Sequence, residues 1–164
     1  MTYVKVFVLP HGDAQKFIPE IPSLAIRIFD TFPDNDGTQS LEECSNWVKI
    51  LNYTFDDIEV NRYPPEHITK MLLKNPEFIL FNKDLSDQIC EDFSYFKDVE
   101  QLIVHCTFGW KRSPAVTRAL QEIFNLDMQW GNERTARIMD FIHEGLPWRG
   151  NEYVYHLMKQ ELAS

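Results

Sequence analysis

The chain has 164 residues, of which 44% are hydrophobic and 25% are charged, and its net charge is −9. This length and composition suit one globular domain over residues 1–164, and the acidic balance disfavours nucleic acid as a partner. No apolar run approaches the roughly 20 residues that span a bilayer, and the first residues resemble a strand more than a signal peptide, so we expect a cytoplasmic protein without membrane contact.

The first half of the chain predicts strands separated by turns. Apolar or β-rich runs predict strands at residues 3–9, 24–29 and 47–55. A short helix is expected at 12–17, and a loop at 30–40, where Pro, Asn, Asp and Gly cluster. Residues 56–82 contain Pro64, Pro65 and Pro76, which predicts a long excursion over the active face with a short helix at 66–73.

The second half predicts helices around one short, fully apolar strand at residues 102–104. Apolar residues recur at helical spacing in 84–96 and 113–125, and further helices are expected at 131–143 and 152–162. Strands that alternate with helices favour a sheet buried on both faces. The predicted fold is therefore α/β, with three layers and a central, mainly parallel sheet flanked by helices.

The cysteines are Cys44, Cys90 and Cys106. Because their number is odd and no secretory segment is recognised, a disulfide framework is not expected. The sequence has no Cys-x-x-Cys pair and no histidine ligand spacing, so we expect neither a metal nor another cofactor. Cys44 and Cys90 lie in ordinary contexts, where a cysteine is usually a small buried hydrophobe.

Cys106 has a distinct context, because an apolar strand runs directly into it and a helix is expected to start at Ser113 and Pro114. Serine is a favoured N-cap and proline a favoured first helical residue. The N–H groups of the intervening loop and of the helix start then converge to bind a tetrahedral anion such as phosphate, sulfate or vanadate. The same positive field favours a thiolate at Cys106, which makes it a candidate nucleophile.

Other residues of this segment have predicted supporting roles. Arg112, six positions after Cys106, can return over the loop and offer a planar fork to two phosphate oxygens. His105 can fix the loop by hydrogen bonding, and Gly109 permits a turn that a side chain would block. The loop that would bind the substrate consists of Thr107, Phe108, Gly109, Trp110 and Lys111.

The pattern His-Cys-x-x-Gly-x-x-Arg-Ser, at His105, Cys106, Gly109, Arg112 and Ser113, resembles the signature of the protein tyrosine and dual-specificity phosphatases. The wider chain resembles a small phosphatase-like family of phages and bacteria over roughly residues 1–160. The segments that carry this wider resemblance are 26–30, 55–58, 81–82 and 102–106, together with Asn151 and Val154. The resemblance implies a phosphatase-like fold.

The resemblance also implies a two-step reaction without metal. Cys106 would attack phosphorus and form a phosphocysteine, Arg112 would stabilise the equatorial oxygens, and Ser113 would hydrogen bond the thiol and help it leave. An aspartic acid on a loop after a strand would protonate the leaving oxygen and then activate water. Asp57 is the favoured acid, because the family pattern resembles Phe-x-Asp at this point, and Asp56 is the alternative.

Three residues depart from that pattern and leave the substrate open. Phe108 and Trp110 stand where smaller residues are usual and could stack on an aromatic leaving group, whereas Lys111 could favour a polyanion. The expected partner is a phosphorylated protein, on phosphotyrosine or also phosphoserine and phosphothreonine, or a small phosphorylated substrate. The alternatives are a non-catalytic phosphoprotein-binding module, a phosphatase of phosphoinositide, inositol phosphate or RNA 5′-phosphate, and a rhodanese-like sulfurtransferase.

Overall fold

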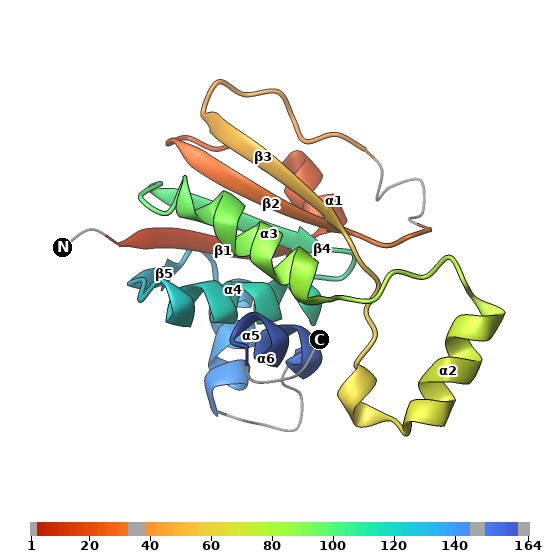
Figure 1. Ribbon diagram of the computed structural model, residues 1–164. Helices are drawn as coiled ribbons and strands as arrows, with labels where there is room; N and C mark the ends of the chain where they lie inside the picture. Colours follow the sequence, from red (N-terminus) through yellow and green to blue (C-terminus); the bar gives the residue numbers. More distant parts are fainter. Residues whose placement is uncertain (1–2, 33–38, 145–149, 161–164) are drawn as a thin grey trace.

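The structure is a computed structural model that describes residues 3–32, 39–144 and 150–160. Five strands form one sheet in the order β3-β2-β4-β1-β5, and every pair of neighbouring strands is parallel (Figure 1). The predicted α/β class with a parallel sheet flanked by helices is therefore confirmed. The strands are β1 (Val4–Pro10), β2 (Ser23–Phe29), β3 (Trp47–Thr54), β4 (Gln101–Cys106) and β5 (Met128–Trp130).

Helices follow most of the strands, as the crossover connections of a parallel sheet require. They are α1 (His11–Lys16), α2 (Pro65–Lys74), α3 (Lys83–Ser94), α4 (Arg112–Ile123), α5 (Glu133–Glu144) and α6 (Glu152–Met158), with a short 3-10 turn η2 (Val60–Arg62). The last residues of the predicted helix at 152–162 and most of the predicted loop at 30–40 lie outside the described residues.

The central strand β4 explains where the core lies. All six of its residues are buried, as expected for a strand covered on both faces. Its side chains alternate, so that Leu102, Val104 and Cys106 join the larger core cluster, and Ile103 joins a smaller one on the other face. This alternation places Cys106 and His105 on opposite faces of the sheet.

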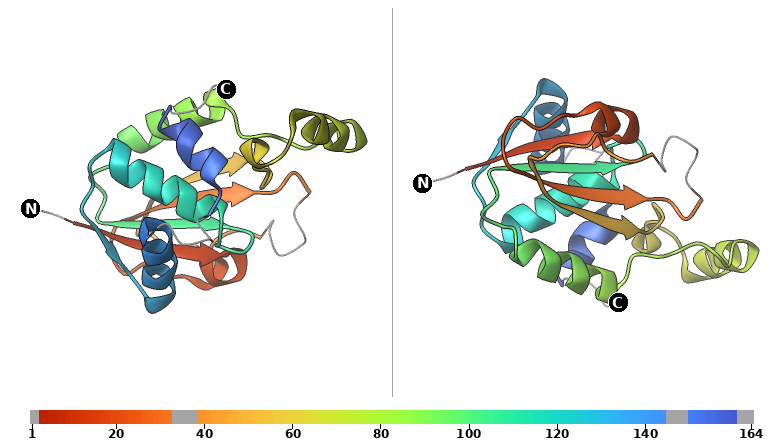
Figure 2. Two further views of the ribbon diagram at one scale, coloured as in Figure 1. Left: turned by 90° about the horizontal axis from the view of Figure 1, so that it is seen from below. Right: turned by 90° about the horizontal axis from the view of Figure 1, so that it is seen from above.

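The two faces of the sheet are covered unequally (Figures 1 and 2). Helices α3, α4, α5 and α6 pack over one face, where they bury the larger cluster with residues such as Phe93, Leu120 and Met139. The other face carries α1 and the segment before β3, with Ala14, Leu41 and Trp47 around the smaller cluster. The face covered by four helices is the one that includes α4, and α4 begins next to Cys106.

The structure differs from the sequence predictions in three places. Strand β5 was not predicted, because its three residues are too few for a periodic signal. Helix α4 begins at Arg112 with Lys111 in the N-cap position, so the prediction of Ser113 as N-cap is wrong; the Ser113 hydroxyl contacts the Cys106 thiol instead. Finally, only the start of the predicted excursion at 56–82 reaches the loop after Cys106, through Asp57 and Glu59, whereas α2 projects away from the sheet (Figures 1 and 2).

None of the helices in the described parts of the chain has the length and apolar composition needed to cross a membrane.

Candidate functional site

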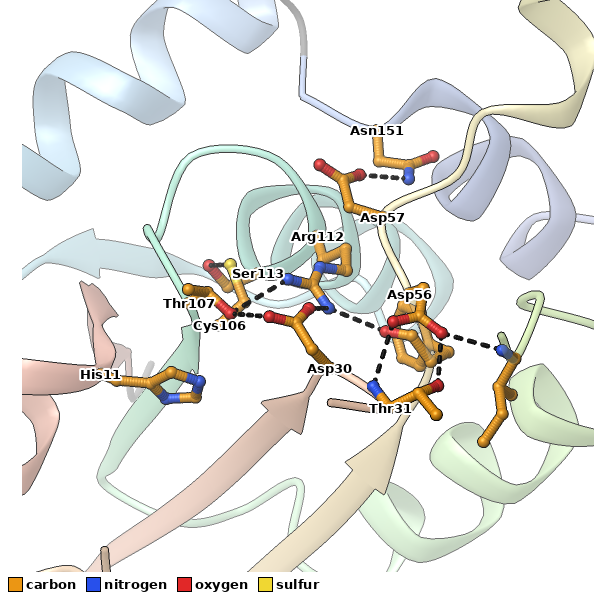
Figure 3. Close-up of polar contacts among 12 residues, drawn as sticks. His11, Asp30, Thr31, Asp56, Asp57, Cys106, Thr107, Arg112, Ser113 and Asn151 are labelled. Atoms are coloured by element: carbon orange, nitrogen blue, oxygen red, sulfur yellow. Dashed lines mark hydrogen bonds and ion pairs between the residues drawn. The ribbon is translucent and has the colours of Figure 1, made fainter. Parts of the chain in front are cut away.

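Cys106 is the last residue of the central strand, and the loop that follows it returns to the start of α4. Its thiol is buried, with only 2% of the residue exposed. The Sγ atom lies 3.2 Å from the Oγ atom of Ser113, which is itself fully buried in the first turn of α4 (Figure 3). The first N–H groups of a helix have no intrahelical acceptor, so the start of α4 offers donors and a positive field beside this sulfur.

Gly109 makes the tight loop possible. Its φ angle is +67°, which disfavours any residue with a side chain. A Cβ atom there would also lie only 2.6 Å from the backbone carbon of Leu9, in the neighbouring strand β1. The predicted role of Gly109 in the turn therefore has two physical causes, the left-handed backbone and the close approach of β1.

Arg134 supports the same loop from α5. Its guanidinium donates to the carbonyl oxygen of Phe108 at 2.8 Å and to that of Val8 at 2.9 Å, so it joins the loop to β1. It also lies 5.9 Å from the centre of the Trp110 ring. Burial lowers the pKa of Arg134, but a guanidinium remains charged at neutral pH.

The guanidinium of Arg112 turns back over the loop, as the sequence predicted (Figure 3). Nη1 donates to the carbonyl oxygen of Phe55 at 2.8 Å and pairs with Oδ1 of Asp30 at 2.7 Å. Nη2 donates to Oγ1 of Thr107 at 3.3 Å. The Nε atom is buried without a hydrogen-bond partner among the described residues, so the side chain retains a donor for a further acceptor.

The adjacent carboxylates Asp56 and Asp57 have different surroundings (Figure 3). Asp56 is buried and accepts hydrogen bonds from the backbone N–H of Thr31 at 3.0 Å, from the Thr31 hydroxyl, and from the backbone N–H of Ile79 at 2.8 Å. Asp57 is exposed and lines the same pocket as Cys106 and Arg112. The position of Asp57, and not that of Asp56, suits proton transfer to a bound group.

Asn151 holds Asp57 in place from the far end of the chain. Its side-chain N–H donates to Oδ1 of Asp57 at 2.8 Å, while its Oδ1 caps α6 by accepting from the N–H of Val154 at 3.0 Å. Its backbone N–H donates to the carbonyl oxygen of Lys111 at 3.1 Å. Asn151 is fully buried and therefore links the nucleophile loop, the candidate acid and α6.

Lys111 is neutralised by a buried carboxylate. Its ammonium lies 3.0 Å from Oε2 of Glu59, which also pairs with Arg62 at 3.2 Å. Oε1 of Glu59 accepts from the backbone N–H of Glu152 at 3.1 Å. Glu59 is therefore shared between the charges of Lys111 and Arg62, whereas Arg112 has a carboxylate partner of its own in Asp30.

His105 lies on the opposite face of β4, where it contacts α1 and β2. Nε2 accepts from Arg27 at 2.9 Å, and Nδ1 lies 2.7 Å from Nδ1 of His11. Burial, His11 and then Arg27 lower the pKa of His105 to about 2, so the ring is neutral. Because its Nε2 is an acceptor, its proton lies on Nδ1 and is donated to His11. His105 therefore fixes the strand beneath the loop rather than contacting the pocket.

A pocket of about 370 Å³ opens above the loop. We call its buried lining residues Cys106 and Arg112, together with Ser113 behind the thiol, the floor. The more exposed lining residues Asp57, Phe108, Trp110 and Lys111 are the rim. Phe108 is 72% exposed and Trp110 is 53% exposed. Trp110 also lines a neighbouring pocket of about 580 Å³ along α5. Within the described residues, no group of three or more His, Cys, Asp or Glu side chains could hold a metal ion.

All three cysteines are free thiols, and Cys44 and Cys90 are half-buried. Cys44 donates to the carbonyl oxygen of Pro19 at 3.4 Å, and burial raises the pKa of Cys90.

Asp30, Glu59, Arg134 and Asn151 hold the site together, although no sequence pattern predicted a role for them. Their contacts join segments far apart in the chain, and a single charged or polar residue gives no local signal of such contacts. Asn151 was noted as part of a family pattern, and its position before a predicted helix could have indicated the cap.

The comparisons with known proteins identify no relative: no family model, no curated protein and no solved structure matches this chain.

Proposed function

We propose that this protein is a cysteine-dependent phosphomonoester hydrolase, in which Cys106 is the nucleophile and Arg112 binds the phosphoryl group. The observation that supports it most directly is the floor of the pocket, where the Cys106 thiol meets Ser113 at 3.2 Å beside an arginine whose Nε has no partner among the described residues. The resemblance of residues 105–113 to the tyrosine and dual-specificity phosphatases supports the same function.

In the first step, the thiolate of Cys106 attacks phosphorus. An S–P bond forms while the bond from phosphorus to the leaving oxygen breaks, and that oxygen takes a proton from the carboxylic acid of Asp57. Arg112 and the N–H groups of the loop bind the three equatorial oxygens, where they are positioned before the reaction begins. The products of this step are a phosphocysteine and a free alcohol or phenol.

In the second step, water attacks the phosphocysteine. The Asp57 carboxylate accepts a proton from this water, a new P–O bond forms, and the S–P bond breaks. The Ser113 hydroxyl donates to the departing sulfur and stabilises its negative charge. The cycle consumes one water, releases inorganic phosphate and returns Cys106 as a thiolate.

The rim favours a phosphorylated protein as substrate, on phosphotyrosine or on both phosphotyrosine and phosphoserine or phosphothreonine. Phe108 and Trp110 offer exposed rings to an aromatic leaving group. A polyanion such as an inositol phosphate fits less well, because both cations that line the pocket already pair with carboxylates, Lys111 with Glu59 and Arg112 with Asp30. A binding module without turnover would need neither the Ser113 contact nor a carboxylate that faces the pocket.

The test is the turnover of p-nitrophenyl phosphate by the wild-type chain and by Cys106→Ser. We expect the wild type to hydrolyse this substrate, and Cys106→Ser to lose turnover while it still binds tungstate, a tetrahedral oxyanion. Acid quenching during turnover should trap a wild-type chain that carries one added phosphoryl group. Cys90→Ser is the matched control and should remain fully active.

Full activity in Cys106→Ser, or a wild type that binds tungstate without any turnover, would overturn the proposal. The second result would support the phosphate-binding module instead.

A further inference from the structure

Asp30 contacts both ends of the loop that follows the nucleophile. It comes directly after β2, and its Oδ1 lies 2.7 Å from Nη1 of Arg112. Its Oδ2 accepts from the hydroxyl of Thr107 at 2.6 Å. The carboxylate of Asp30 therefore contacts both Thr107, the first residue after Cys106, and Arg112, the sixth residue after Cys106 (Figure 3).

The contacts of Arg112 show which edge of the guanidinium Asp30 leaves open. Nη1 donates to the carbonyl oxygen of Phe55 at 2.8 Å and forms the ion pair with Asp30 at 2.7 Å. Nε has no partner among the described residues, and Nη2 makes only the 3.3 Å contact with Thr107. Nε and Nη2 therefore form the edge that Asp30 does not hold, and their parallel N–H groups match two oxygens of a phosphoryl group.

We propose that Asp30 is a positioning residue that orients the Nε–Nη2 edge of Arg112 toward the phosphoryl group. The inference rests on the proposed function and assigns a residue to the same site. Asp30 binds only the amino group that the substrate does not need, and it fixes the Thr107 hydroxyl on the other side of the loop. The arginine is therefore ordered before the substrate arrives, which lowers the entropic cost of binding.

Asp30 is itself held by its neighbour in the chain. The backbone N–H and the hydroxyl of Thr31 both donate to Asp56, which in turn receives the backbone N–H of Ile79. This buried carboxylate fixes the turn after β2, and the turn carries Asp30 toward the loop. The arrangement gives Asp56 a structural role and joins it to the site through Thr31 and Asp30.

A competing role for Asp30 would be to occupy the place of the phosphate and block it. The contacts disfavour this role, because the carboxylate pairs with Nη1 and leaves Nε without a partner. The two roles predict opposite changes in anion affinity when the carboxylate is removed. A positioning residue strengthens anion binding, whereas a competitor weakens it.

The experiment is titration of tungstate into the wild-type chain and into Asp30→Ala and Asp30→Asn, followed by calorimetry. We expect Asp30→Ala to weaken binding roughly 10- to 100-fold, as a misplaced catalytic group does. Asp30→Asn keeps an oxygen for Arg112 and should recover part of the loss. Asp87→Asn is the matched control, because Asp87 is an exposed aspartate paired with Lys83 on α3, and it should bind as the wild type does.

A double-mutant cycle with Arg112→Lys separates positioning from a general effect on folding. Lysine lacks the Nη1 group that Asp30 holds, so Asp30→Ala should change affinity little in this background. Thermal unfolding of each variant identifies those that fold. Should Asp30→Ala not fold, the same comparison is made with Asp30→Asn.

The possible failures are distinguishable. A wild type that neither binds tungstate nor hydrolyses p-nitrophenyl phosphate would overturn the proposed function and this inference together. If the wild type does both, the inference alone is overturned by unchanged or tighter binding in Asp30→Ala. An equal loss from Asp30→Ala in the wild-type and Arg112→Lys backgrounds would also overturn it.

Discussion

The floor and the rim of the pocket are built differently, although they lie only a few residues apart in the chain. The floor residues Cys106, Arg112 and Ser113 are buried and touch one another or the backbone of neighbouring strands. The rim residues Phe108 and Trp110 are exposed. Chemistry that depends on fixed distances is thus assigned to the floor, and contact with the rest of a substrate to the rim. Asp57 combines both features, because it is exposed but held by Asn151.

The largest effect is expected at the boundary between floor and rim, in Asp57→Asn. Loss of the acid should lower kcat/KM about 10²- to 10⁴-fold for alkyl phosphates and less for p-nitrophenyl phosphate, whose leaving group needs no proton. The dependence of kcat/KM on the leaving group is measured with a series of aryl phosphates whose phenols differ in acidity. Asp56→Asn is the matched control and should lower thermal stability without changing the dependence on the leaving group. If Asp56→Asn, and not Asp57→Asn, changed the dependence on the leaving group, the acid would be Asp56.

A smaller effect is expected within the floor, in Ser113→Ala. Removal of the hydroxyl leaves the departing sulfur without its hydrogen bond, which contributes about 1.5–3 kcal/mol when one partner is charged. We therefore expect kcat to fall roughly 10- to 100-fold, with accumulation of phosphocysteine detected by rapid quenching and mass spectrometry. Ser86→Ala removes a buried hydroxyl from α3 and should leave kcat unchanged. An unchanged kcat in Ser113→Ala would argue against its role in sulfur departure.

Burial of His105 beneath the floor predicts that the free energy of unfolding depends on pH. Its pKa lies near 2 in the folded protein, below the ordinary value of 6.5, so between these values the unfolded chain binds more protons. The stabilisation is complete above about pH 6.5 and decreases as the pH falls, by up to about 1.4 kcal/mol per pH unit. His105→Gln should show a flatter decrease in denaturant unfolding between pH 6.5 and 4.5.

Among the described residues, the charged or titratable groups that contact His105 are His11 and Arg27. Both remain in the variant, so the difference in slope reports on His105. The exposed His67 provides a control, and His67→Gln should keep the wild-type slope. Equal slopes in the wild type and His105→Gln would show that His105 is not buried in its neutral form.

The smallest effect is expected at the rim, in Trp110→Ala. Loss of an aromatic contact of about 0.5–1.5 kcal/mol should raise KM a few-fold for aryl phosphates and leave small alkyl phosphates unaffected. Tyr95→Ala removes an exposed ring outside the pocket and is the control. Equal changes for aryl and alkyl substrates would show that Trp110 does not select the leaving group.

Local patterns predicted most of the fold. Apolar or β-rich runs were sufficient to predict β1 to β4, because each of these strands buries several consecutive or alternate side chains. Strand β5 was not predicted, because it has only three residues. The start of α4 was misplaced because Ser113 has two uses for its hydroxyl, and the contact with Cys106 prevails over capping.

The candidate site could be predicted only where its residues are contiguous. Residues 105–113 share one strand, one loop and one helix start, so their spacing in the sequence determines their positions in space. Asp30 and Glu59 reach the same loop from other strands, and their contacts depend on the order of β2, β3 and β4 in the sheet. A sequence pattern does not encode that order.

The buried amide of Asn151 has a consequence for how the protein is made. Asp57 and Asn151 are separated by 94 positions, so a growing chain releases the nucleophile and the candidate acid well before the residue that anchors the acid. A chain that ended before α6 would contain Cys106, Arg112 and Asp57 but would lack the hydrogen bonds from Asn151 to Asp57 and to Lys111. The proposed activity should therefore depend on Asn151 and on the helix that it caps, although neither touches the Cys106 thiol.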